Sequence, residues 1–143
     1  MRPSDIRPDI ALKAQLEGNI VLQKSETESA VIDVYAQGEK PTSGLSSEFV
    51  EILFNGAIRS LTKPLGVIRG NLIVSVYVRS YEDGSVFQYR ADSILKQIEE
   101  MTSNKEYGNF FFEFDTTNIV TPATTNIISG YSTTVLNVKW HTI

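Results

Sequence analysis

Two carboxylates near the end of the chain have a spacing that could support shared chemistry. Glu113 and Asp115 lie two residues apart in the predicted strand 109–116, so their side chains fall on one face of it. A pair of carboxylates can supply the acid and the base or nucleophile of a glycosidase. Simple alternation along a solvated strand produces the same pair, and no ordered aromatic residues for sugar stacking accompany it. The sequence therefore favours a solvated face over a small hydrolase that uses Glu113 and Asp115.

The single histidine, His141, is the one imidazole available for catalysis or metal binding. A Ser-His-Asp triad would have to use it, but no Gly-x-Ser-x-Gly elbow presents a nucleophile. The chain has no cysteine, which excludes disulfides and thiolate metal sites. The sequence thus predicts no catalytic residue, no cofactor and no metal site, and it assigns His141 to a surface or an interface.

Glycines and charges near predicted turns have ordinary interpretations. The scattered glycines form no phosphate-binding motif and are interpreted as turn residues. They are Gly66, Gly70, Gly84, Gly108 and Gly130. Arg79, Asp83 and Arg90 surround the turn between a predicted strand and a predicted helix. They are surface charges or, in a ring-forming protein, charges that set the register between subunits.

Composition places the chain among ordinary globular domains and limits its partners. It has 143 residues, of which 41% are hydrophobic, and a formal net charge of −4. This length is enough to bury a core. No cluster of lysine and arginine indicates a protein that wraps nucleic acid. No apolar run approaches transmembrane length, and the first residues lack the apolar stretch of a signal peptide. We expect a protein that is made and used in the cytosol, or built into an assembly there.

The hydrophobic pattern predicts strands along most of the chain. Strands are expected at 19–24, 30–37, 71–80, 109–116 and 130–142. Asn55-Gly56 between two apolar runs predicts a hairpin of strands 48–54 and 57–62, with a helix as the competing interpretation. Polar loops are expected at 38–47, 63–70 and 118–129.

One helix is expected over residues 85–102. Ser85 and Gln88 form a capping box at its start. Its apolar residues recur at helical spacing and form a stripe. The stripe comprises Phe87, Ala91, Ile94, Leu95, Ile98 and Met101.

These elements predict an α+β fold, a mostly antiparallel β-sheet with one long amphipathic helix packed across it. Residues 1–18 form an N-terminal arm or a short helix after Pro8, with both interpretations open. Residues 19–143 form a single α+β domain.

The order of the elements over residues 70–143 resembles that of phage tail-terminator proteins and, more broadly, of head–tail connector and neck proteins. The resemblance rests on the strand NLIVSVYVRS, the helix ADSILKQIEEM and the closing strand GYSTTVLNVKWHT. No diagnostic residue motif accompanies it. The early Pro8 and the Asn55-Gly56 hairpin depart from the family's pattern, which leaves the position in the ring open.

The resemblance implies a structural virion protein and no enzyme. Its copies would form a ring, such as a hexamer or dodecamer, at the head–tail junction through which DNA passes. Other tail or connector proteins would be its partners, with transient contact to DNA, no sequence-specific binding and no membrane. Assembly would take place in the host cytoplasm. The rival functions are a small hydrolase that uses Glu113 and Asp115, and a monomeric module that binds its ligand at a sheet edge.

Overall fold

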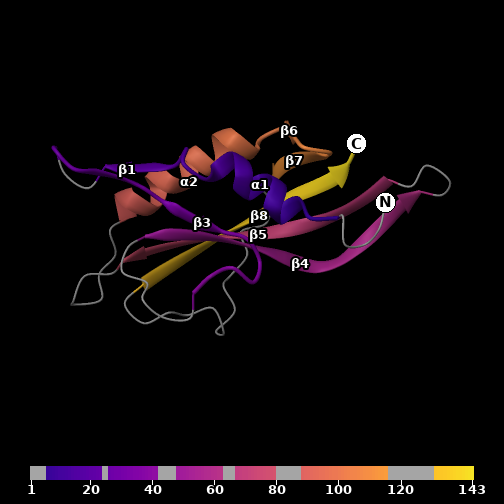
Figure 1. Cartoon of the computed structure of the whole chain (residues 1–143), viewed down its shortest axis with the longest axis horizontal. Helices are drawn as coiled ribbons and strands as arrows, with labels where there is room; N and C mark the ends of the chain where they lie inside the picture. The colour runs from indigo at the N-terminus through magenta and orange to yellow at the C-terminus, as the bar shows by residue number, and fades with distance from the viewer. Residues whose placement is uncertain (1–5, 24–25, 42–47, 63–66, 80–87, 116–130) are drawn as a thin grey trace.

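The structure is a computed structural model that describes residues 6–23, 26–41, 48–62, 67–79, 88–115 and 131–143 (Figure 1). At 56–62, 67, 88, 89 and 115 it describes the backbone alone. The elements in chain order are α1 (Pro8–Leu16), β1 (Val21–Gln23), β2 (Ser29–Val31), β3 (Asp33–Tyr35), β4 (Phe49–Thr62), β5 (Val67–Arg79), α2 (Gln88–Thr102), β6 (Lys105–Tyr107), β7 (Phe110–Asp115) and β8 (Tyr131–Thr142).

A curled six-stranded sheet dominates the molecule, with strand order β3-β4-β5-β8-β7-β6. Strand β3 runs parallel to β4, and every other neighbouring pair is antiparallel. β1 and β2 form a separate antiparallel pair.

The expected α+β fold, with one long helix across an antiparallel sheet, is wrong. The protein is mostly β, with 52% of the chain in strands, and its sheet is mixed. The strand-forming runs extend further than expected, because residues 55–56 and 67–70, which were expected in a turn and a loop, belong to β4 and β5. Two helices and the β1–β2 pair share the covering of the sheet, so no single helix crosses it (Figure 1).

The face of the sheet beneath α1 and α2, here the inner face, carries the main apolar core. Alternate residues of β5 meet the helices there, as their period-two spacing predicts. The predicted stripe of α2 is buried at Ala91, Ile94 and Ile98, whereas Leu95 and Met101 are partly buried. Phe87 and the predicted capping box at Ser85 lie outside the described residues. The inner-face residues of β5 that are buried are Leu72, Val74, Val76 and Val78.

The segment that was expected to be an arm or a short helix contains α1. Pro8 stands at the start of this helix, where its missing N–H and fixed φ are no handicap. Leu12 and Leu16 are fully buried in the core. The chain leaves the helix through Gly18, whose φ of +80° suits a glycine.

The predicted hairpin at Asn55-Gly56 is wrong, because β4 continues through both residues. Asn55 pairs with Asn71 and Arg59 pairs with Arg69, so three residues of β4 face Gly70 alone. An Asn-Gly pair can thus belong to a bulge within one strand, because a bulge also accommodates unusual backbone angles. The β4–β5 connection falls at 63–66 instead, outside the described residues.

Gly70 lies inside β5 and is not the turn residue that the sequence predicted. It faces Trp140 of β8 across the ladder. A Cβ atom on Gly70 would lie 2.8 Å from Cζ2 of Trp140, closer than real Cβ contacts. The indole therefore occupies the space that a side chain at position 70 would need. Trp140 also packs edge-on against Phe110, with ring centroids 5.6 Å apart.

The predicted strand 30–37 is split in two. Its first part, β2, pairs with β1, and its second part, β3, joins the main sheet. Between them the N–H of Ile32 donates to the carbonyl of Ile20. Gly66, Gly84, Gly130 and the predicted loop 118–129 lie outside the described residues.

Candidate functional site

The face of the sheet turned away from the helices, here the outer face, carries Glu113 and His141, two of the residues that the sequence singled out. Cross-strand pairing arranges them in rows. One row runs Asn55, Asn71, Lys139 and Glu113 through β4, β5, β8 and β7. The next runs Arg59, Arg69, His141, Phe111 and Glu106 and reaches β6. We call these two rows the polar half of the outer face.

Glu113 and Asp115 have cross-strand neighbours that argue against a glycosidase pair. Glu113 is exposed and faces Lys139, also exposed, in the β7–β8 ladder. Asp115 pairs with Asn137 through the backbone. Glu113 is therefore a solvent-exposed side chain with a lysine opposite it, as expected on a solvated strand face.

His141 lies on the same face, and its ring has an aromatic partner where Glu113 has a charged one. It is exposed and stacks on Phe111, with ring centroids 5.1 Å apart and planes 27° from parallel. Its Nδ1 lies 2.9 Å from the carbonyl oxygen of Thr142, a contact that places the ring proton on Nδ1. No described serine stands in the His141 row between β4 and β6. The assignment of His141 to a surface agrees with its exposure.

An amide cluster lies at the boundary of the polar half, where Asn137 contacts two residues of its first row. Asn137 is 5% exposed and its Nδ2 donates to Oδ1 of Asn71 at 3.1 Å. Asn55 Nδ2 donates to Oδ1 of Asn137 at 3.4 Å. These side chains link β4, β5 and β8 by hydrogen bonds, so their polar atoms serve to hold the sheet together.

The other end of the outer face is a buried aromatic cluster, here the aromatic half, which the sequence reading missed. Phe49 stacks on Tyr77 at 4.5 Å between ring centroids, and both are almost fully buried. Tyr35 and Tyr131 approach Phe49 edge-on at 5.8 and 5.5 Å. Each aromatic residue belongs to a different strand, so only the strand order brings them together.

Charged groups surround this aromatic half. Lys40, between β3 and β4, lies over the Tyr77 ring at 5.7 Å and 3.9 Å from Oε2 of Glu51. The Tyr77 hydroxyl donates to Oε1 of Glu51 at 3.4 Å. Burial, with the Glu51 carboxylate, raises the pKa of Tyr77 to about 12. Tyr77 therefore stays neutral across the physiological range.

The two arginines considered for subunit register differ in their surroundings. Arg79 is exposed and lies 5.5 Å over the Tyr131 ring. Arg90 Nη1 donates to Oε1 of the buried Glu48 at 2.8 Å, which ties the first turn of α2 to the start of β4. Arg90 thus has a structural partner within the subunit. Asp83 lies outside the described residues.

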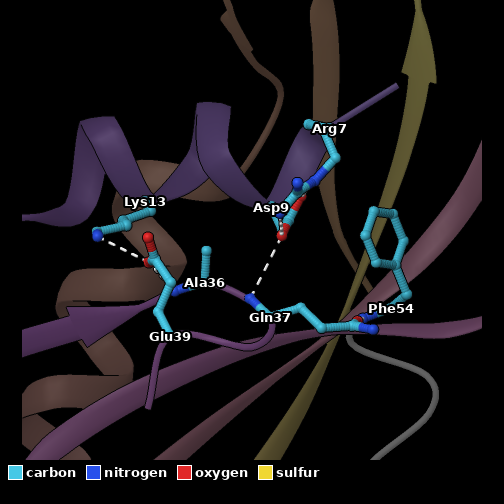
Figure 2. A network of polar contacts seen from close by, with 7 residues as sticks. All are labelled: Arg7, Asp9, Lys13, Ala36, Gln37, Glu39 and Phe54. Atoms are coloured by element: carbon cyan, nitrogen blue, oxygen red, sulfur yellow. Dashed lines mark hydrogen bonds and ion pairs between the residues drawn. The ribbon is translucent and has the colours of Figure 1, made fainter. Parts of the chain in front are cut away.

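The outer edge of β4 carries the most distinctive backbone feature. β3 pairs with β4 only from Phe49 to Glu51, whereas β5 pairs with β4 as far as Thr62. Within the described part of the chain, no strand pairs with this edge beyond Glu51. The Phe54 N–H donates to the Gln37 side-chain oxygen at 2.8 Å, where a neighbouring strand would offer a carbonyl (Figure 2).

A polar network fixes the segment that holds Gln37 against α1 (Figure 2). The fully buried Asp9 carboxylate accepts two hydrogen bonds from Arg7, at 3.0 and 2.9 Å, and one from the Gln37 N–H at 3.3 Å. Glu39 accepts from Lys13 at 2.7 Å and from the Ala36 N–H at 2.8 Å. The hydrogen bond from Lys13 lowers the pKa of Glu39. The network places Gln37 at the edge of β4.

At the opposite edge of the sheet, the outermost strand also pairs with only part of its neighbour. β6 pairs with β7 only over Phe110–Phe112, so Glu113–Asp115 have no outer strand among the described residues. Lys105 and Glu106 of β6 are exposed. Both edges therefore end in a strand of three residues that leaves part of a longer strand open.

Ligand-binding features are scarce in the described ranges. No group of three histidine, cysteine or acidic residues there could hold a metal ion. No described helix is long and apolar enough to cross a membrane. Comparison with models of protein families and with curated proteins finds no match to this chain.

Proposed function

We propose that this chain is a structural protein of a phage virion, of the tail-terminator or neck type. Its copies form a ring at the head–tail junction through which DNA passes. The observation that carries the proposal is the construction of the two sheet edges. Among the described residues, each edge leaves part of a long strand without an outer neighbour, and an unpaired strand edge readily pairs with another chain.

The two edges differ from each other, which has a consequence for assembly. A contact that joins the β4 edge of one copy to the β6–β7 edge of the next is heterologous, or head to tail. Such contacts close into a ring when the rotation between copies permits. The resemblance of residues 70–143 to tail-terminator and neck proteins supports the same form of assembly.

The surroundings of the candidate catalytic residues also favour a structural role over the hydrolase. Glu113 faces a lysine and His141 stacks on Phe111, and both are exposed. These are the arrangements of a solvated sheet face. The net negative charge of the chain is also compatible with DNA that passes without binding tightly, because tight binding depends on Lys and Arg contacts to phosphates.

The experiment is to measure the mass of the purified protein by native mass spectrometry over a range of concentrations and to image phage particles that carry it. We expect one closed ring of copies at the head–tail junction. Particles that hold scattered single copies, or none, would refute the proposal.

A monomeric binding module is the second candidate, because the same β4 edge could take a strand from a different protein. Mass separates the two candidates. A module would remain a monomer at every concentration and would be absent from particles, whereas the structural protein would be found in the ring.

A further inference from the structure

The open edge of β4 has a definite backbone polarity. In an antiparallel ladder, facing residues alternately point their N–H and C=O groups toward and away from each other. Phe54 directs its N–H outward to Gln37. Ser60 faces Ile68, and the Ile68 N–H donates to Oγ1 of Thr142 on the β8 side. The backbone groups of Ser60 therefore point to the open edge of β4.

Along one row of the polar half, the side-chain charge changes from basic at one edge of the sheet to acidic at the other. The row that begins at this edge reads Arg59, Arg69, His141, Phe111 and Glu106. Its one acidic residue stands at the far edge, in β6, and is exposed. One edge of the sheet is therefore basic in this row and the other edge is acidic.

The β4 end of the row places two basic residues at facing register positions. Arg59 and Arg69 occupy directly facing positions in the β4–β5 ladder. Like charges at facing positions destabilise a pair of strands. An acidic group brought to the β4 edge would offset this repulsion.

We propose that the β4 edge beyond Phe54 is joined in the ring by the β6 edge of a second copy, with Glu106 of that copy beside Arg59. This inference rests on the proposed function, because it names the surfaces that build the ring. The occupant is a second copy, because the chain's own far edge carries the complementary charge in the exposed Glu106, and no described strand pairs with the outer side of β6. Gln37 already accepts the Phe54 hydrogen bond, so the added strand pairs past that residue.

A charge swap tests the pairing. Arg59→Glu places two glutamates at each junction, and Glu106→Arg places two arginines there. We expect each single variant to weaken assembly at least tenfold, measured by sedimentation, and the double variant R59E/E106R to restore it. Glu100→Arg, a charge reversal at an exposed position of α2, is the matched control and should assemble like the parent.

A backbone variant gives a second readout. Ser60→Pro removes an outward N–H, a position where an edge strand tolerates proline. We expect a folded protein that no longer assembles, whereas Ser60→Ala should assemble normally. If Ser60→Pro does not fold, the charge swap decides.

The outcomes separate the two proposals. Rings that persist in both single charge variants would overturn the β4–β6 junction and leave the ring intact. A double variant that stays as weak as the singles would also overturn it. If the parent protein forms no ring, in solution or in particles, both proposals fail.

Discussion

The two halves of the outer face are built from the same strands and yet differ in almost every property. In the aromatic half, Phe49 and Tyr77 are buried beneath the segment that carries Lys40. In the polar half, Arg69, Lys139 and Glu113 remain exposed. The face thus has a buried half that stabilises the fold and a half in which several described side chains are exposed.

The comparison teaches that a sheet with two partly buried faces can keep one region available without losing its core. The inner face is covered by helices, and the aromatic half adds a second, smaller core behind it. Changes in the aromatic half should therefore lower stability, and charge reversals at Arg59 or Glu106 in the polar half should alter assembly.

The largest loss of stability is expected from a substitution in the aromatic half. Phe49→Ala removes a ring that stacks on Tyr77 and should lower the free energy of unfolding by about 3–5 kcal/mol. Phe111→Ala, the matched change in the polar half, should cost about 1 kcal/mol or less. Urea denaturation of both variants measures the difference. Equal losses would show that the two halves do not differ as described.

A smaller effect is expected at Gly70 of β5, which faces Trp140 across the ladder. Gly70→Ala forces a Cβ against the Trp140 indole and should cost about 1–3 kcal/mol. Trp140→Phe in the same chain provides room, so the double variant should lose less than the sum of the two single changes. Thermal melting of the three variants tests this. Strict additivity would mean that the contact is not strained by the new methyl group.

The dependence of stability on alkaline pH tests the aromatic half through Tyr77. The folded-state pKa of about 12 lies above the unfolded value near 10, so the unfolded chain releases its proton first. The contribution of Tyr77 to stability is complete below pH 10 and is lost as the pH rises toward 12. Tyr77→Phe should flatten that part of the pH profile. A variant whose stability falls as steeply as the parent's would assign the loss to other groups.

The smallest expected effect concerns the polar half. Glu113→Gln removes one member of an exposed pair with Lys139 and should change stability by about 0.2–1 kcal/mol. The triple variant E113Q/D115N/H141Q should still fold and assemble. A turnover on a carbohydrate or ester substrate that the parent shows and this variant loses would instead support the hydrolase.

The sequence predicted the central strands well, because their side chains alternate over long runs. Leu72, Val74, Val76 and Val78 share the buried inner face as expected, and β7 and β8 lie within one residue of their predicted bounds. The Asn55-Gly56 hairpin failed because the turn signal is local, whereas the long β4–β5 ladder is stabilised by pairing on both sides of it.

The remaining features depend on contacts that no local pattern encodes. The parallel placement of β3 beside β4 creates the aromatic half, and its residues come from four separate strands. The charge order from Arg59 to Glu106 also appears only once strand order and register are known. Glu113, Asp115 and His141 could be found from residue type, but their exposure and their neighbours could not.

The central position of β8 has a consequence for folding in the cell. Among the described strands β8 comes latest in the sequence, and it pairs from Tyr131 to His141 with β5, far earlier in the chain. Contacts between such distant segments form slowly, because a long loop must close first. Until β8 emerges from the ribosome, the apolar strand β5 has an unpaired side, and such strands are prone to aggregate. Deletion of β8 would remove the centre of the sheet, so a chain interrupted before residue 131 should aggregate.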